Sequence, residues 1–141
     1  MRNLHDYQDS RKPRREVVVA LIECEGETVL VKNIEGLRRD WQLPGSRVED
    51  GVAPLTAMSR ILLSETGLNI PANRLKLVKS VPRETNVAQQ IVYCYRVALP
   101  AGGLNNLPST SPDGHHVRRV PLRTLRQLLN EADNKLIAAF T

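Results

Sequence analysis

Residues 41–68 constrain the fold of this 141-residue chain more than any other segment. They open with Trp-Gln-Leu-Pro-Gly, which is typical of a short strand that a Pro-Gly pair ends. A helix is predicted over Pro54–Thr66, because proline is tolerated in a first helical turn and Gly67 is a stop signal. A loop over 44–53 leads into it. The helix has one clear apolar stripe, at Leu55, Met58 and Leu62.

The same segment resembles the Nudix box, whose family pattern is G-x5-E-x7-R-E-U-x-E-E-x-G-U with U an aliphatic residue. The agreement extends to the preceding Trp and Leu-Pro-Gly. The matching positions of the box are Arg60, Leu62, Glu65, Gly67 and Leu68. On this resemblance the chain is identified as a member of the Nudix hydrolase family.

The box is degenerate, because several of its characteristic residues are replaced. Ser46 stands at the first glycine of the pattern. Three glutamate positions hold Val52, Ile61 and Ser64. In the family these acids, with the one matched by Glu65, present carboxylates to Mg²⁺ or Mn²⁺ along a substrate diphosphate. The resemblance therefore implies a weakened metal site.

The rest of the chain alternates β-branched, apolar runs with a few helical patterns, which predicts the α/β class. Some neighbouring strands are spaced as in hairpins, so a mixed sheet is expected. The resemblance to the Nudix family implies a Nudix-type α/β/α sandwich. Thr28–Lys32 is expected to return as a hairpin partner of the first strand. The expected strands are Glu16–Cys24, Thr28–Lys32, Arg74–Val81, Ala88–Leu99 and His116–Val120, with loops at Pro82–Val87 and Pro100–Gly114. The expected late helices are Leu122–Asn130 and Asn134–Phe140.

Two parts of the chain are distinguished, a flexible basic amino-terminal arm over residues 1–15 and a Nudix-like domain over residues 16–141. The arm ends in Arg-Lys-Pro-Arg-Arg. Clustered cations of this kind contact the phosphates of nucleic acid or another partner. A solvated tail is the favoured interpretation, because no aromatic residues interleave with the charges.

The candidate site residues follow from the box. Glu65 is the one box carboxylate retained for catalysis and metal binding, and Glu49 of the preceding loop matches a frequent family glutamate that would assist it in both roles. Hard divalent cations need such oxygen ligands, so weak or substrate-dependent Mg²⁺ or Mn²⁺ binding is expected. Arg60 pairs with the remaining carboxylates or, in the second interpretation, contacts a substrate phosphate. Glu84, Asp113, His115 and His116 are secondary candidates, since some family members supply a further acid or base near the last three.

Composition sets broad limits on partners and location. Twenty basic and 15 acidic residues give a net charge of +5, which favours anionic ligands weakly. Cys24 and Cys94 lie in apolar runs without metal-ligand spacing, as buried reduced thiols do. No segment approaches the roughly 20 apolar residues of a membrane span. Residues 1–10 are polar and do not resemble a signal peptide, so a cytoplasmic location is expected.

Two functions from different classes remain open. The first is hydrolysis, weak or absent, of a nucleoside diphosphate linked to another group, which the resemblance implies. The second is a module without catalysis that binds a nucleotide or an ADP-ribose-like ligand, which the replaced carboxylates favour. In both, a small nucleoside diphosphate derivative is the expected partner. Nucleic-acid binding through the arm is a weaker third interpretation.

Overall fold

A computed structural model describes residues 13–33 and 41–140. Its main sheet has four strands in the order β3-β1-β5-β4. Strands β1 and β5 run parallel, whereas β3 and β4 run antiparallel to their neighbours, so the sheet is mixed, as predicted. These strands are β1 (Arg14–Glu23), β3 (Gly45–Arg47), β4 (Lys76–Glu84) and β5 (Gln89–Ala98).

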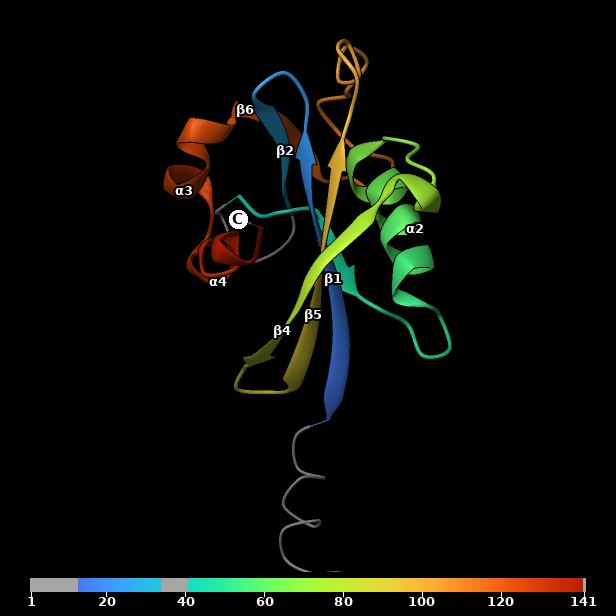
Figure 1. Ribbon diagram of the computed structural model, residues 1–141, viewed down its shortest axis with the longest axis vertical. Coiled ribbons are helices and arrows are strands. Elements are labelled where there is room, and N and C mark those ends of the chain that lie inside the picture. The colour runs from blue at the N-terminus through green and yellow to red at the C-terminus, as the bar shows by residue number, and fades with distance from the viewer. Residues whose placement is uncertain (1–12, 34–40, 141) are drawn as a thin grey trace, which may run out of the picture.

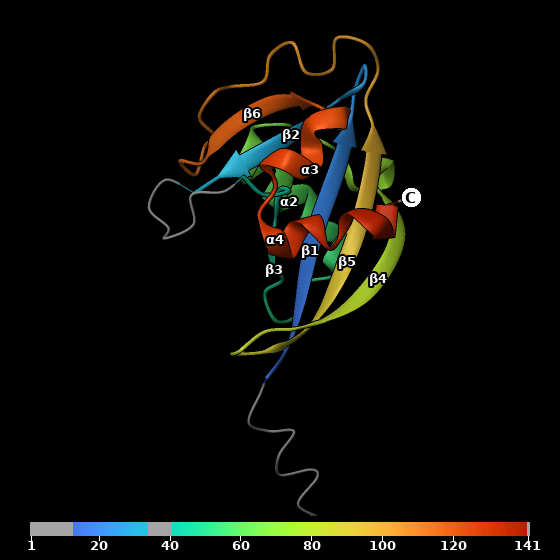
Figure 2. The same cartoon turned by 90° about the vertical axis from the view of Figure 1, so that its left-hand side faces the viewer.

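Helix α2 (Pro54–Thr66) covers one face of this sheet, and the carboxyl-terminal helices cover the other (Figures 1 and 2). Val18, Ala20 and Ile22 of β1 face the α2 side of the core. The alternate residues Val17, Val19 and Leu21 face the opposite side. Because alternate side chains point to opposite faces, a strand buried on both faces must be apolar throughout. The predicted α/β/α sandwich is confirmed.

Helix α2 has the predicted bounds. Pro54 occupies its first turn, and Gly67 ends it with a φ of 79°, a left-handed conformation that glycine adopts without strain. The predicted stripe is partly wrong. Leu55 is 38% exposed, and Ala57 is buried beside Met58 and Leu62 instead.

The predicted hairpin between the first two strands is also corrected. Among the described residues, the bridge between Cys24 and Glu27 is the only backbone pairing between the two segments. Strand β2 (Glu27–Lys32) pairs with β6 (His116–Pro121) in a separate two-stranded sheet. The apolar runs are located correctly, but strand pairing depends on residues far away in the sequence.

Several element boundaries differ from the prediction. Strand β3 begins at Gly45, where a strand was expected to stop, and β4 continues through Pro82 to Glu84. Proline is tolerated there because β4 is an edge strand of the sheet. The two late helices are shorter and interrupted, comprising α3 (Leu125–Leu128), α4 (Glu131–Asn134) and 3-10 turns at Leu122–Thr124 and Ile137–Phe140. A further 3-10 turn, Ala72–Arg74, precedes β4.

Strand β1 starts at Arg14, so the last two residues of the expected arm belong to the sheet. Residues 1–12 of that arm lie outside the described part of the chain. Within the described residues, no helix has the length and hydrophobicity needed to cross a membrane.

Candidate functional site

Glu65 is a buried carboxylate in the last turn of α2, with 6% of its surface exposed. Its Oε1 accepts a hydrogen bond from the backbone N–H of Gly45 at 2.9 Å. Burial disfavours the charged form and raises the pKa of Glu65 to about 7, although the Gly45 hydrogen bond acts in the opposite direction. A carboxyl group with such a pKa changes its protonation state near neutral pH.

Gly45 allows the loop to approach both β1 and Glu65. It pairs with Val19 in the ladder between β1 and β3. A Cβ atom at this position would collide with the carbonyl oxygen of Val18 and would lie 2.8 Å from Cγ1 of Val19. The close approach of two backbones therefore requires glycine here, and it aims the Gly45 N–H at Glu65.

We expect Gly45→Ala to destabilise the protein by about 2 kcal/mol, because the methyl group forces β3 away from β1. Chemical denaturation measures this change. Ser46→Ala, at the exposed neighbouring position, is the control and should change stability by less than about 0.5 kcal/mol. Equal stability of the two variants would contradict the close approach.

Asp113 and His115 lie beside Glu65 because the segment after β5 folds back onto the end of α2. The backbone N–H of Asp113 donates to the carbonyl of Ser64 at 3.1 Å. Asp113 Oδ1 accepts from Ser111 Oγ at 2.5 Å and lies 2.6 Å from His115 Nδ1. These hydrogen bonds lower the pKa of Asp113 against the opposing effect of burial, which is the largest single influence on it.

Glu65, Asp113 and His115 form a group that is able to hold a metal ion. One donor atom from each lies within 4.8 Å of the other two. Two carboxylates and one imidazole suit Mn²⁺ better than Mg²⁺, which prefers oxygen ligands alone. Asp113 occupies Nδ1 of His115, so Nε2 is the ring nitrogen that remains for a ligand. His116, the other secondary histidine, is exposed and pairs with Lys32 in the second sheet.

Glu49 lies in the loop before α2, and Arg60 lies in the middle of that helix. Both are exposed and line a hollow of about 190 Å³ together with Val52 and Ile61. In the described part of the chain, Arg60 makes no ion pair, and the group around Glu65 does not include Glu49. The structure therefore does not bring Glu49 and Glu65 together as ligands of one metal ion.

A cleft of about 210 Å³ adjoins the group on the face of the main sheet that the carboxyl-terminal helices cover. Gly45 belongs to its lining and also donates to Glu65, so the cleft and the group are neighbours. Asp133 of α4 lies in the cleft, where its Oδ2 accepts from the backbone N–H of Leu43 at 2.9 Å. Arg83 lies there too, with Nη1 3.8 Å from Asp133 Oδ1.

Sequence reasoning missed Asp133 and Arg83 as site residues. The pattern Asn130-x-x-Asp133 marks a helix start, and the Asn130 side chain does accept from the Asp133 N–H at 2.8 Å. Nothing in that pattern indicates which way the Asp133 carboxylate points. Only the packing of α4 against the sheet places it in the cleft.

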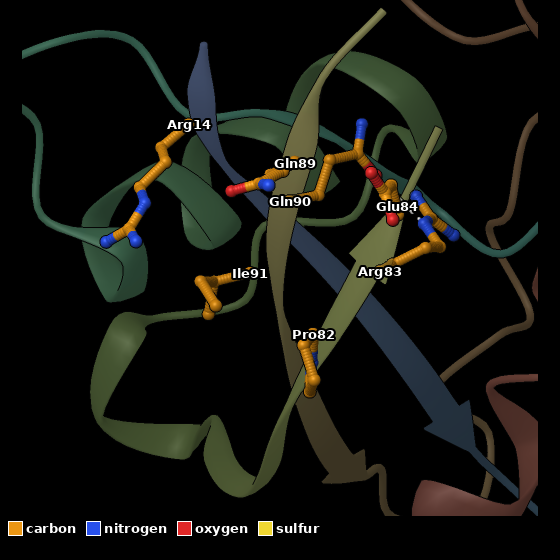
Figure 3. Close-up of a pocket in the computed structure, with 7 residues that line it drawn as sticks. All are labelled: Arg14, Pro82, Arg83, Glu84, Gln89, Gln90 and Ile91. Carbon is orange, nitrogen blue, oxygen red and sulfur yellow. Dashed lines mark hydrogen bonds between the residues drawn. The ribbon is translucent and has the colours of Figure 1, made fainter. Parts of the chain in front are cut away.

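Another hollow, of about 510 Å³, lies at the β4–β5 hairpin, away from the Glu65 group (Figure 3). Pro82, Glu84 and Ile91 line it, and Arg14 extends from the other side. It shares Arg83 and Gln90 with the cleft but includes no member of the Glu65 group. Glu84, one of the secondary candidates, is therefore placed away from that group.

The comparisons with known proteins agree on one family. The model of the NUDIX domain matches residues 12–140. No curated protein sequence matches this chain significantly.

Solved structures that are similar share the fold. The MutT NUDIX hydrolase of Burkholderia pseudomallei has a TM-score of 0.74 at 22% identity, over 92% of this chain and 100% of that one. The NUDIX domain of Shewanella oneidensis NrtR, complexed with ADP ribose, has a TM-score of 0.73 at 16% identity, over 99% and 97%. A bifunctional NMN adenylyltransferase/ADP ribose pyrophosphatase from Francisella tularensis, complexed with AMP and a Mn ion, has a TM-score of 0.70 at 18% identity, over 95% and 43%.

Proposed function

This chain belongs to the NUDIX domain family, and from that premise we propose that it binds a nucleoside diphosphate linked to a further group and hydrolyses the diphosphate only slowly. The observation that carries the proposal is the group Glu65, Asp113 and His115 at the edge of the cleft. One similar fold has been solved with ADP ribose, which is a ligand of this class, and another with AMP, a nucleoside monophosphate, and a Mn ion.

Each residue of the group contributes to binding the diphosphate end of the ligand through a metal ion. Glu65 and Asp113 supply carboxylate oxygens and His115 supplies a ring nitrogen, a set of donors that suits Mn²⁺. When bound, such an ion neutralises charge on the diphosphate and favours attack by water. Gly45 fixes the Glu65 carboxylate, and Ser111 and His115 fix that of Asp113.

Slow hydrolysis is proposed because α2 and the loop before it lack the other box acids. Val52 and Ile61 offer no donor oxygen, and the Ser64 hydroxyl donates to the carbonyl of Ile61 at 3.1 Å. Fewer carboxylates hold fewer ions, and charge that develops on the diphosphate is then less well neutralised. Binding without any hydrolysis is the second candidate, and the same three positions support it.

Mn²⁺ should bind the wild-type protein in the presence of ADP-ribose and should bind about tenfold more weakly to Asp113→Asn or His115→Gln, because each loses one ligand or its orientation. Isothermal titration calorimetry measures both affinities, and AMP release measured in parallel separates slow hydrolysis from binding alone. Mg²⁺ without ADP-ribose should bind weakly, since it prefers its own water ligands.

His116→Gln is the matched control for this experiment, since it alters the exposed histidine next to the group. It should keep the wild-type Mn²⁺ affinity. Wild-type protein that binds neither Mn²⁺ nor ADP-ribose would refute the proposal, and so would equal losses in all three variants.

A further inference from the structure

Three arginines face the cleft beyond the Glu65 group. Arg15 of β1 and Arg83 of β4 both pair in register with Gln90 of β5, which makes one row across three neighbouring strands. Adjacent strands lie about 4.8 Å apart, so the two arginines are separated by roughly 10 Å at the backbone. Arg47 of β3 pairs with Val17, two residues beyond Arg15, and lines the same cleft.

The charges of this row are not balanced within the cleft. Asp133 is the one carboxylate that lines it in the described part of the chain, against Arg15, Arg47 and Arg83. Within the cleft lining the positive charges therefore outnumber the negative ones by two, although Arg15 and Arg47 also line a neighbouring hollow that holds Glu16, Glu49 and Asp50. Like charges this close repel one another, and an anionic ligand would remove that repulsion.

Two guanidinium nitrogens also lack acceptors. Among the described residues, Nε of Arg15 and Nη1 of Arg83 are shielded from solvent and have no hydrogen-bond partner. The Arg83 Nε donates to Gln90 at 2.8 Å, which holds the side chain in place, while the 3.8 Å from Nη1 to Asp133 is too long for a hydrogen bond. Buried donors are rarely left unsatisfied, so oxygen atoms from a ligand are the expected partners.

We propose that this arginine row, Arg15, Arg47 and Arg83, binds a phosphomonoester carried by the nucleoside half of the ligand. The inference rests on the proposed function, because it assumes that the diphosphate lies at the Glu65 group and the nucleoside extends into the cleft. A phosphomonoester carries a charge of roughly −1.5 to −2 at pH 7, which suits the excess of positive charge in the cleft lining. Its several oxygens also suit forked guanidinium donors and could accept from the unsatisfied nitrogens of Arg15 and Arg83 together.

The test compares ADP-ribose with the same compound phosphorylated on the 2′- or 3′-hydroxyl of its adenosine. Calorimetry with Mn²⁺ present gives the ratio of the two dissociation constants. In the wild type, one phosphorylated form should bind at least about tenfold more tightly, and the preference should shrink as salt is added. In Arg15→Gln/Arg83→Gln the ratio should fall to about one.

A control variant removes the same amount of charge elsewhere. Arg123→Gln/Arg126→Gln alters two exposed arginines at the carboxyl-terminal helices, neither of which lines the cleft, and should keep the wild-type ratio. If circular dichroism shows the first double variant to be poorly folded, Arg83→Lys replaces it. That variant keeps the positive charge but loses the forked pair of guanidinium donors. It should lower the ratio of the two dissociation constants several-fold.

The outcomes distinguish a failure of the arginine row from a failure of the proposed function. A wild-type ratio near one, with both compounds bound, overturns the arginine row alone. A high ratio that persists in the Arg15 and Arg83 variants overturns it as well, since the phosphate is then recognised elsewhere. Wild-type protein that binds neither compound refutes the proposed function itself, and with it the proposed role of the arginine row.

Discussion

The free energy of unfolding of the metal-free protein is expected to fall by about 3 kcal/mol as the pH rises from 4.5 to 7.5. The cause is burial of Glu65, which raises its pKa from 4.5 to about 7 in the folded protein. Between these two values the folded state keeps the proton that the unfolded state has released. The stabilisation is therefore complete below pH 4.5, is lost as the pH rises towards 7, and changes no further above it. Urea denaturation at half-unit pH intervals, with a chelator present, measures this fall.

Glu65→Gln isolates this effect. The amide cannot ionise, and its oxygen still accepts from the Gly45 N–H, so the variant should be more stable than the wild type above pH 7 and show no fall in this window. Glu49→Gln makes the same charge change at an exposed position and should retain the fall. Saturating Mn²⁺ should abolish it in the wild type, because a metal-bound carboxylate no longer needs a proton. Parallel pH profiles of the wild type and Glu65→Gln would contradict the assignment.

The sequence predicted helix α2 accurately because both of its ends carry local signals. Proline suits the first turn, and Gly67 supplies the left-handed residue that ends the helix. The register of the box then identified Glu65 as the retained acid, which lies in the group able to hold a metal. These features depend on residues close together in the chain.

Features that depend on distant residues were not predictable in the same way. The partner of β2 is β6, so Leu30 pairs with Arg118 rather than with a residue of β1. Asp113 and His115 were only secondary candidates, because no local pattern shows that the Asp113 N–H reaches the Ser64 carbonyl. The arginine row likewise exists only through the register of four strands, β3, β1, β5 and β4.

Restoring the three replaced acids together is expected to raise Mn²⁺-dependent hydrolysis of ADP-ribose by about 100-fold or more. The variant is Val52→Glu/Ile61→Glu/Ser64→Glu. It would add three carboxylates to the helix and the preceding loop, and the hollow that Val52 and Ile61 line gives two of them space. Single restorations should have far smaller effects, since residues that act as one unit are strongly non-additive.

The restored acids should also make folding depend on metal. Val52 and Ile61 are partly buried and pack against the core on the α2 side, so replacing them with carboxylates should cost about 2–4 kcal/mol without metal. Saturating Mn²⁺ should recover much of that loss by neutralising the clustered acids. Melting temperature and AMP release, each with and without Mn²⁺, measure the two effects.

Leu63→Glu is the control for this variant, because it adds an acid to an exposed position of the same helix. It should leave both metal dependence and turnover at the wild-type level. Wild-type protein that already hydrolyses ADP-ribose as fast as the restored variant would show that the replaced acids do not limit the reaction. A folded variant that binds Mn²⁺ tightly yet releases no AMP would place the limit in the cleft, where Asp133 and the arginine row decide how the nucleoside is held.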